Sequence, residues 1–296
     1  MQKSECNLCG NTEFRKLFKT QGNEQGVGFF PSSDVIGNDL IVKCPRCGLV
    51  FVNPLPDEKN MIEEYSNFKD ERFASQSKGR EITFARNLKD IEKFKKRGSL
   101  LDVGTANGSF LYTARKNGWD VDGVELNKYL INWAKENYQL NIKQGTIFQN
   151  KFQKKFDVVT LWDVLEHVSD PTKTLAKCNE LMKDDGILIV NYPDYRSRVA
   201  TLLGKKWPFY LRVHLYYFDR KTIVKMLDKC GFKVLKIKPH IQYLDLGYIF
   251  FRAKRYIGMP ASIAISIINF LGLKNKKVPY NIGQTLVIAK KKTNVY

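Results

Sequence analysis

The chain has 296 residues, of which 43% are hydrophobic and 27% are charged, and its formal net charge at neutral pH is +19. This length and apolar fraction are typical of a globular chain with one full domain and a smaller module, and they exclude a low-complexity protein. We expect a cytoplasmic protein, because the polar N-terminus has no apolar signal-peptide core and no apolar run is long enough to span a membrane.

The first motif in the chain consists of two C-x-x-C pairs, each followed by a glycine. The pairs are formed by Cys6, Cys9, Cys44 and Cys47. Two such pairs supply four thiolates, which suit a closed tetrahedral site for a structural zinc ion. A redox-active C-x-x-C is the alternative, but no thioredoxin-like sequence surrounds either pair. We therefore predict a small zinc-binding module.

The remainder of the chain predicts an α/β fold. Short apolar runs alternate with helical patterns, which is typical of a parallel sheet covered by helices on both faces. The predicted strands are 99–103, 119–124, 140–144, 156–161, 186–192, 232–238 and 284–290, and the predicted helices are 108–117, 127–138, 171–183 and 219–230. The predicted organisation is a zinc-binding module (1–56), a charged helical linker (57–97), an α/β domain (98–239 with 283–292) and an insertion (240–282).

A glycine loop between the first predicted strand of the α/β domain and its helix indicates a ligand site. Asp102 lies near the end of the strand, and Gly104 and Gly108 lie in the loop. Such a loop brings the backbone close to a nucleotide-like ligand. It matches neither the dinucleotide fingerprint nor the phosphate-binding P-loop. An acid without a phosphate-binding lysine suits a cationic, phosphate-free cofactor such as S-adenosylmethionine.

Together with the segments that follow, this loop resembles the class I S-adenosylmethionine-dependent methyltransferases. The matching segments, in chain order, are DVGTANGSF (102–110), GVELN (123–127), FDVVTLWDVLEHVSDP (156–171) and GILIVNYP (186–193). The resemblance implies a Rossmann-like, doubly wound, mostly parallel sheet whose last strand is antiparallel. It also implies S-adenosylmethionine as the cofactor.

The same resemblance assigns the cofactor-binding residues. They are Asp102, Gly104, Thr105, Gly108, Glu125, Leu126, Asn127, Gly145, Thr146 and Asp163. Within this set, Glu125 would bind the ribose hydroxyls, and Gly145 with Thr146 would border the adenine. Thr146 stands where the family often has an acid. Asp163 would lie where the cofactor meets the substrate.

A histidine is the best candidate for the base that removes the acceptor's proton at neutral pH. Of the three in the chain, His214 lies in RVHLYYF (212–218), where this family's substrate loop runs. The segment resembles the H-x-x-Y-F segment of a subgroup with an N-terminal four-Cys zinc module, which includes deoxysugar C-methyltransferases. The resemblance assigns His214 as the base, and we predict that Tyr217 orients the acceptor. The alternative is a loop histidine that anchors Tyr217.

The other two histidines are predicted to have structural roles. His167 belongs to DVLEH (163–167), which resembles an acid-x-x-Glu-His segment that quinone-ring O-methyltransferases tie to a divalent metal. Relatives without a metal carry the segment too, so we expect His167 to cap or pack near the cofactor pocket. His240 has no partner visible in the sequence.

The positive charge is concentrated in the last third of the chain. Residues 1–195 carry 28 basic and 27 acidic residues, whereas residues 196–296 carry 21 and three. Such a field attracts phosphates, anionic lipid or nucleic acid, and solvated basic helix faces are the alternative. Inside the insertion (240–282), the apolar stretch 259–271 is flanked by cations, as in helices that lie in a membrane interface. A lid or an oligomer contact are the alternatives.

We therefore expect a cytoplasmic methyltransferase with a structural zinc module. For the insertion a lid or an oligomer contact is favoured, and peripheral contact with the inner face of the membrane is the alternative. The predicted acceptor is an anionic, phosphate-bearing sugar, in the form of a nucleotide-sugar or a lipid-linked glycan. The alternatives are an RNA methyltransferase, a quinone or lipid O-methyltransferase, and a zinc-bearing binding protein without activity. Nucleic acid is the less favoured partner, because the cysteine module itself is not basic.

Overall fold

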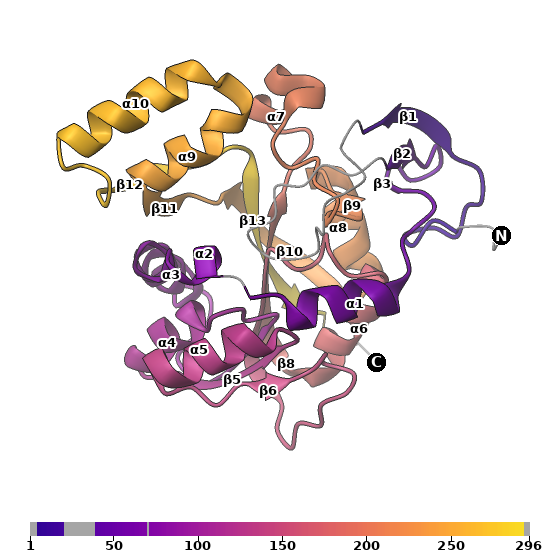
Figure 1. The fold of residues 1–296 in the computed structure, drawn as a ribbon. Coiled ribbons are helices and arrows are strands. Elements are labelled where there is room, and N and C mark those ends of the chain that lie inside the picture. Colours follow the sequence, from indigo (N-terminus) through magenta and orange to yellow (C-terminus); the bar gives the residue numbers. More distant parts are fainter. Residues whose placement is uncertain (1–4, 21–38, 70, 293–296) are drawn as a thin grey trace.

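The computed structural model describes residues 5–20, 39–69 and 71–292. Its central element is a seven-stranded sheet, and Figure 1 shows how the other elements surround it. The strands are β4 (Ser99–Val103), β5 (Asp120–Glu125), β6 (Lys143–Gln144), β7 (Phe156–Trp162), β8 (Met182–Pro193), β10 (Phe232–Pro239) and β13 (Gln284–Lys291). Their order across the sheet is β10-β13-β8-β7-β4-β5-β6. Strand β13 is antiparallel to both neighbours, and β8, β7, β4, β5 and β6 are parallel to one another. The predicted mostly parallel sheet with an antiparallel last strand is confirmed.

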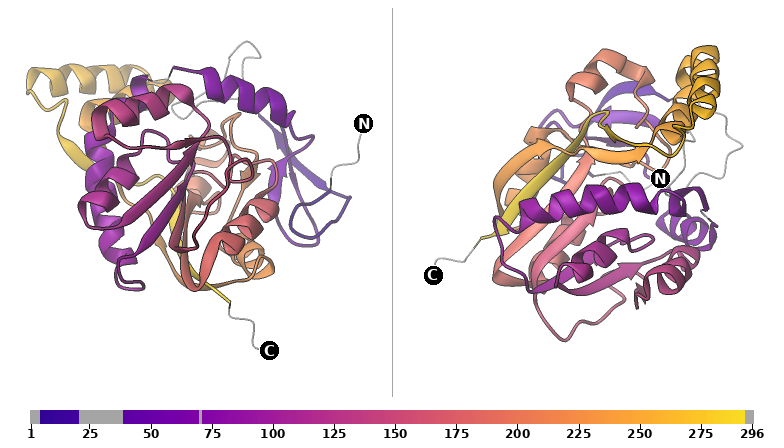
Figure 2. Two further views of the ribbon diagram at one scale, coloured as in Figure 1. Left: turned by 90° about the horizontal axis from the view of Figure 1, so that it is seen from below. Right: turned by 90° about the vertical axis from the view of Figure 1, so that its left-hand side faces the viewer.

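Each face of the sheet has its own apolar core, because successive side chains of a strand point to opposite faces. In β4, Leu100 packs in one core and Leu101 in the other. Figure 2 shows the helices that cover the two sides. The Leu100 face is covered by α3 (Ser77–Ile91), α4 (Ser109–Lys116) and α5 (Lys128–Tyr138), and the Leu101 face by α6 (Pro171–Leu181) and α8 (Arg220–Lys229).

The predicted strand 140–144 is much shorter in the structure, where only Lys143 and Gln144 pair with β5. The chain leaves α5 through Gln139 in a left-handed conformation, with a φ angle of 53°. Leu140 and Ile142 are then buried against the helical layer. Their apolar character therefore reflects packing beneath α4 and α5, because only the two residues that follow reach the strand ladder.

The cysteine module contributes to a second, smaller sheet. This sheet contains β1 (Arg15–Lys19), β2 (Leu40–Lys43), β3 (Val50–Val52) and β9 (Tyr216–Tyr217), in that order. Strand β9 belongs to the α/β part of the chain and pairs with β3 (Figure 1). Of the predicted module (1–56), residues 1–4 and 21–38 lie outside the described part of the chain.

The module is also attached to the helical layer. Asn7 Nδ2 donates to Asp170 Oδ1 over 2.7 Å, and the amide of Thr172 donates back to Asn7 Oδ1 over 3.0 Å. Asp170 is the N-cap of α6. The side chains of Leu8 and Leu49 join the core on the Leu101 face of the main sheet. The cysteine module and the α/β domain thus share one packed interior.

The predicted helical linker (57–97) contains α1 (Glu58–Asn67), α2 (Glu71–Ala74) and α3. The insertion (240–282) folds as β11 (Gln242–Asp245), α9 (Leu246–Ile257), α10 (Met259–Phe270) and β12 (Lys277–Tyr280), and β11 pairs antiparallel with β12. A further short helix, α7 (Arg198–Leu203), and the 3-10 turn η1 (Gly204–Lys206) follow β8. Helices α7, α9 and α10 lie at the end of the sheet where β8 ends (Figure 1).

Within the described residues, no helix combines the length and the apolarity that crossing a bilayer requires.

Candidate active site

The loop after β4 is shaped by three residues in the left-handed region of backbone space. They are Gly104, Ala106 and Gly108, with φ angles of 68°, 49° and 72°. A Cβ on Gly104 would lie 2.7 Å from a methyl carbon of Val164. The amides of Gly104 and Thr105 donate to the carbonyl of Val124 over 2.9 and 3.1 Å. The loop therefore turns tightly over the ends of β4 and β5, where a larger residue at position 104 would displace it.

Asp102 lies at the base of this loop and is almost fully buried. Its carboxylate accepts a hydrogen bond from the Thr160 hydroxyl over 2.5 Å, which ties β4 to β7. Burial raises the pKa of Asp102 to about 7, although the hydrogen bond from Thr160 opposes the shift. A cationic ligand near this carboxyl would favour its ionised form.

Glu125 ends β5 and presents its carboxylate to the same loop. One oxygen accepts from the amide of Ala106 over 2.7 Å, and the other accepts from the amides of Leu126 and Asn127 over 2.8 Å each. The side chain is 1% exposed, and burial raises the pKa of Glu125 against the effect of these amides. A carboxylate with several converging donors is a suitable acceptor for vicinal hydroxyl groups.

Asn127 holds the end of α1 against the loop that follows Glu125. Its Oδ1 accepts from the amide of Leu130 and so caps α5, while its Nδ2 donates to the carbonyls of Tyr65 and Phe68 over 2.7 and 2.8 Å. Tyr65 also forms a side-chain hydrogen bond with Glu125. The end of α1 is therefore held directly over the predicted ribose site.

Gly145 and Thr146 follow β6 beside Glu125. The amide of Gly145, with a φ angle of 113°, donates to the Glu125 carbonyl over 2.8 Å. The Thr146 hydroxyl accepts from the amide of Phe148 over 3.3 Å, and its own amide donates to Gln149. Thr146 thus closes a turn, and its hydroxyl is used within that turn.

Asp163 follows the end of β7 and links three strands. Its φ angle is 52°, and its amide donates to Asn191 Oδ1 over 2.9 Å. The carboxylate accepts from Asn191 Nδ2 over 2.6 Å and from Gln284 Nε2 over 2.8 Å. Burial raises the pKa of Asp163, and the Arg80 guanidinium lowers it. The structure places this residue at the carboxyl edge of the sheet, as predicted, with its side chain committed to β8 and β13.

Glu166, His167 and His214 form a buried cluster at the same edge. One ligand atom from each of the three lies within 4.8 Å of the others. The two imidazole rings meet edge to face at 4.7 Å. Both carboxylate oxygens of Glu166 are buried and have no hydrogen-bond partner among the described residues. The sequence predicted His214 as the base and noted Glu166 only within the DVLEH segment that resembles a metal-binding one; it did not predict that the two residues meet.

Backbone carbonyls fix the tautomer of both histidines. His167 Nδ1 lies 2.8 Å from the carbonyl oxygen of Val213, and His214 Nδ1 lies 2.7 Å from that of Phe209. A carbonyl only accepts hydrogen bonds, so each Nδ1 carries the proton and each Nε2 keeps its lone pair in the neutral ring. The two Nε2 atoms are therefore available to a proton or to a metal ion.

Burial controls the protonation of this cluster. It lowers the pKa of His167 to about 4, and it lowers the pKa of His214 well below its usual value with added repulsion from His167 and Arg252. Burial, together with the charge of Asp163, raises the pKa of Glu166 well above its usual range. Both histidines are thus neutral at pH 7, which is the form that accepts a proton.

Tyr217, the second predicted catalytic residue, lies in β9, and its ring centroid is 6.5 Å from that of His214. The ring is buried in a cluster with Ile41, Val50 and Trp207, between the cysteine module and the segment that contains α7. Its role in orienting an acceptor stays a prediction, since its visible contacts are packing contacts.

The four predicted metal ligands converge. The Sγ atoms of Cys6, Cys9, Cys44 and Cys47 all lie within 4.8 Å of one another, with 3.4 Å between Cys6 and Cys47 and 3.5 Å between Cys9 and Cys44. In each C-x-x-C turn the glycine that follows donates to the carbonyl of the first cysteine. Tetrahedral zinc with sulfur at roughly 2.3 Å requires sulfur–sulfur distances of about 3.8 Å. The set fits such an ion.

Further buried polar atoms without a partner among the described residues surround the end of the sheet. They are Asn107 Nδ2 in the glycine loop, Trp162 Nε1 at the end of β7, Tyr192 Oη near the end of β8 and Gln284 Oε1 at the start of β13. Buried polar atoms are nearly always hydrogen-bonded in a complete complex. This edge is therefore complementary to a ligand with several polar groups.

The sequence profile of the family described as "Methyltransferase domain" matches residues 73–237. The chain belongs to this methyltransferase family. The matched region contains β4 to β8 with the glycine loop and Glu125, and it ends within β10.

Curated relatives resemble part of this methyltransferase. A ubiquinone biosynthesis O-methyltransferase of Coxiella burnetii is 32% identical over 120 residues, which cover 38% of this chain and 51% of that protein. One from Actinobacillus pleuropneumoniae is 32% identical over 100 residues, or 30% and 43% of the two chains. The chain thus spans about half the length of the curated relatives it matches.

Two solved structures share the fold. One is a complex between the Haloferax volcanii Trm112 methyltransferase activator and a putative methyltransferase, with a TM-score of 0.53, 13% identity and coverage of 77% of this chain and 98% of that chain. The other is a putative methyltransferase from Bacillus halodurans, with a TM-score of 0.50, 16% identity and coverage of 71% and 99%.

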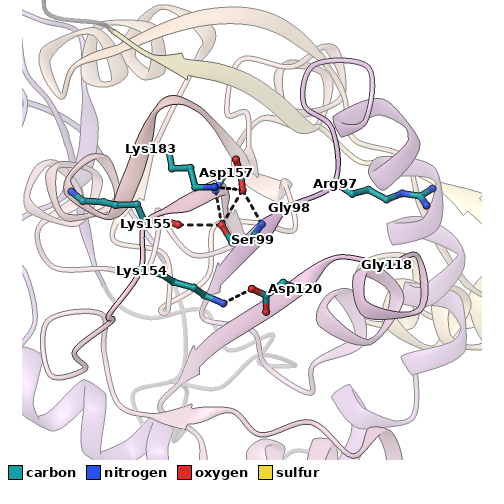
Figure 3. A pocket seen from close by; sticks show the side chains of 9 residues that line it. All are labelled: Arg97, Gly98, Ser99, Gly118, Asp120, Lys154, Lys155, Asp157 and Lys183. Carbon is teal, nitrogen blue, oxygen red and sulfur yellow. Dashed lines mark hydrogen bonds and ion pairs between the residues drawn. The ribbon is translucent and has the colours of Figure 1, made fainter.

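A polar depression lies at the opposite end of the methyltransferase sheet, where β4, β5 and β7 begin (Figure 3). Two of its lysines are paired with carboxylates, since Lys154 lies 2.6 Å from Asp120 and Lys183 lies 2.8 Å from Asp157. The third, Lys155, donates to the backbone carbonyl of Glu180. Asp157 also accepts from the Ser99 amide and hydroxyl. We place the active site at the carboxyl edge, because the glycine loop, Glu125 and the cluster of Glu166, His167 and His214 lie there.

Replacing Glu125 tests the cofactor site. Glu125→Ala removes the carboxylate predicted to accept two ribose hydroxyls. It should weaken S-adenosylmethionine binding by roughly 100-fold or more, since each charge-assisted hydrogen bond contributes about 1.5–3 kcal/mol. Calorimetry with the zinc-loaded protein measures this. Glu180→Ala, an exposed acid on α6, is the matched control. Equal affinity of Glu125→Ala and wild type would refute the assignment.

Replacing one of the four clustered cysteines should impair methyl transfer while leaving cofactor binding intact. Cys44→Ser should release the metal from the purified protein, lower its melting temperature and reduce methyl transfer, while S-adenosylmethionine still binds, because β3 supports β9 and hence the His214 segment. Elemental analysis, thermal melts and calorimetry measure these effects. Cys230→Ser, outside the cluster, should keep full metal content. An unchanged metal content in Cys44→Ser would contradict the site.

The third histidine of the chain, His240, is buried, and its protonation should make the stability of the fold depend on pH. Burial, aided by Lys238, lowers its pKa to about 3, while the unfolded chain titrates near 6.5. The unfolded state therefore binds a proton below about pH 6.5 that the folded state does not, so acidification costs stability. Between about pH 7 and pH 5, wild type should lose about 2 kcal/mol more unfolding free energy than His240→Asn. Urea titrations of both proteins at both pH values measure this. If wild type and His240→Asn lost the same unfolding free energy, His240 would be solvated and the prediction would be wrong.

Proposed function

We propose that the chain transfers the methyl group of S-adenosylmethionine to a sugar that carries phosphate, in a nucleotide-sugar or a lipid-linked glycan. The observation that carries this proposal is the meeting, at one edge of the sheet, of the glycine loop with Glu125 and the buried Glu166, His167 and His214 cluster. A cofactor site and a proton-accepting site side by side are what methyl transfer requires.

The cofactor supplies an activated methyl group on a sulfonium sulfur. The chain has to hold the acceptor in line with that methyl group and remove its proton. His214 is the residue that we assign to proton removal, because its Nε2 lone pair is fixed by the bond from Nδ1 to the Phe209 carbonyl. The acceptor atom bonds to the methyl carbon, the carbon–sulfur bond breaks, and the proton passes to His214.

Glu166 supports this role. A protonated His214 is costly in its buried setting, so its imidazole has to be held firmly for proton transfer. The Glu166 carboxyl group lies in the same cluster and carries no charge at rest, because burial and the charge of Asp163 raise its pKa. In this form it can donate as well as accept a hydrogen bond next to the imidazole. His167, held by the Val213 carbonyl, packs edge to face on His214 and limits its rotation. We therefore assign Glu166 and His167 as positioning residues for His214.

The preference for a phosphate-bearing acceptor rests on nearby cations. The guanidinium groups of Arg80 on α3 and Arg252 on α9 act electrostatically on Asp163 and His214 respectively. Arginine is well suited to bind phosphate through paired N–H donors. An acceptor that spans from His214 toward these helices would place its phosphate between them.

The same cluster favours one second candidate, a quinone-like O-methyltransferase with a divalent metal. One ring nitrogen from each histidine and one carboxylate oxygen of Glu166 lie within 4.8 Å of one another and form a candidate ligand set. Asp163 does not complete it, because its carboxylate is bound to Asn191 and Gln284. The relatives named ubiquinone biosynthesis O-methyltransferase support the same alternative.

Structural zinc is also part of the proposal. The four cysteine sulfurs support a closed site with four thiolate ligands, which has no open position for catalysis. We assign it the task of holding the β1–β2–β3 sheet against β9.

Replacing the proposed base should affect turnover selectively. His214→Ala should lower kcat by roughly 10²–10⁴-fold, the usual contribution of a general base, with little change in S-adenosylmethionine affinity. Methyl transfer to nucleotide-sugars and to lipid-linked sugar phosphates is the assay, and added imidazole should restore part of the activity.

Divalent cations distinguish the two candidate functions. If His214 is the base, added Mg²⁺ leaves wild-type activity on a sugar acceptor unchanged. Activity that appears only with Mg²⁺ and a catechol acceptor would replace our proposal with the metal-assisted one. An active His214→Ala enzyme would exclude both.

A further inference from the structure

The outer face of α10 is an exposed apolar surface without charge. Met259, Ile263, Ile267 and Phe270 are 76%, 55%, 53% and 89% exposed, and Leu271 directly follows them. Their spacing of four, four and three residues places them in one stripe along the helix. No acidic or basic residue occurs between Tyr256 and Leu273. A solvated helix normally turns charged residues outward, so this face is built to be covered.

The helix is held away from the main core but at a fixed place. Its inner side packs on α9 through buried Ala261 and Ile268. Figures 1 and 2 show α10 as the outermost element of the insertion. It is also too short to cross a bilayer, since 12 residues extend only about 18 Å.

The base of the insertion is rigid. The amide of Tyr243 in β11 donates to the Thr83 hydroxyl of α3 over 2.7 Å, and a Cβ on Gly79 would lie only 2.4 Å from the Tyr243 carbonyl oxygen. Lys277 of β12 forms an ion pair with Asp245 of β11. The apolar stripe is therefore presented by a frame that is attached to the active-site side of the methyltransferase domain.

A second apolar element and several cations lie at the same end of the molecule. Leu202 of α7 is 87% exposed, and Figures 1 and 2 place α7 beside the insertion. Exposed lysines flank both apolar elements, and they are Lys205 and Lys206 after α7, Lys254 in α9, and Lys274 and Lys276 after α10. We propose that this end, comprising α7, η1 and the outer face of α10, docks on an anionic membrane surface.

Charge favours a membrane over a second copy of the chain. Two copies that met through α10 would bring their flanking lysines together, whereas anionic lipid headgroups attract them. An uncharged apolar stripe between cations is the arrangement of helices that lie flat in the headgroup region. The lipid surface covers the stripe and pairs with the lysines at the same time.

The docking surface also favours one form of acceptor, an argument that rests on the proposed function. Helix α9 lies between α10 and the sheet, and its Arg252 acts electrostatically on His214. A membrane under α10 would thus hold a lipid-linked sugar phosphate close to the proposed base. Between the two forms of acceptor, this geometry favours the lipid-linked one.

Vesicle sedimentation tests the docking surface independently of methyl transfer. The full zinc-loaded chain should sediment with vesicles of phosphatidylcholine mixed with phosphatidylglycerol, and much less with phosphatidylcholine alone or in high salt. Phe270→Glu should lower the partition coefficient by roughly ten-fold or more, because it places a charge in the apolar stripe. Leu17→Glu, which adds the same charge to the 40% exposed Leu17 of β1, should bind like wild type.

Lysine variants test the electrostatic part. Lys274→Gln with Lys276→Gln should weaken binding by roughly ten-fold, and Lys233→Gln with Lys236→Gln, on the exposed edge strand β10, should not. Absence of vesicle binding by the wild type would overturn the proposal. So would a wild-type dimer that Phe270→Glu converts to a monomer, because a second copy would then cover α10. Unchanged S-adenosylmethionine affinity in the variants shows that the fold and the cofactor site are intact.

Discussion

The pairing of β3 with β9 is the constraint on which the active site depends. Val50 and Phe51 pair with Tyr217 and Tyr216, and the amide of Val52 donates to the Leu215 carbonyl over 2.9 Å. His214 directly precedes this ladder, so the cysteine module fixes where the imidazole stands. Two short C-x-x-C turns cannot form a stable core alone. A bound metal would thus act on the active site through a backbone ladder, without touching the acceptor.

The carboxyl edge of the sheet gathers charges that a protein interior normally rejects. Glu125 is tolerated there because three amides converge on it, and Asp163 because Asn191 and Gln284 donate to it. Glu166 has no such donors among the described residues. This difference suggests different roles. Carboxyl groups with hydrogen-bond donors, such as Glu125 and Asp163, shape the site, whereas a buried carboxyl group without donors, such as Glu166, is a candidate for interaction with the acceptor. The buried cluster around Glu166 is where acceptor binding would change the local electrostatics most.

The sequence predicted the elements whose residues interact locally, and it missed pairings between distant ones. Strand 99–103 and the turn at Gly104 follow from an apolar run and a positive φ requirement, so both were placed correctly. Strand β9 is two residues long and owes its existence to β3, more than 160 positions away, which no local pattern reveals. Glu166 was noted only as part of a segment that resembles a metal-binding one, because nothing in its neighbours along the chain shows that its oxygens would be buried without donors.

The insertion is a second case in which the sequence predicted an element but not its contacts. Its apolar stretch predicted a helix, and α10 begins and ends within a residue of that stretch. The sequence pattern indicates that this helix is apolar but not what covers it. The structure shows that α9 packs on the inner face of α10 and that the outer apolar stripe is exposed. Part of the basic last third of the chain then acquires a location, because the lysines after α7, in α9 and after α10 border this apolar surface. Under the proposed docking, attraction to an anionic surface and access to the acceptor would both follow from the place of these elements at the same end of the sheet as His214.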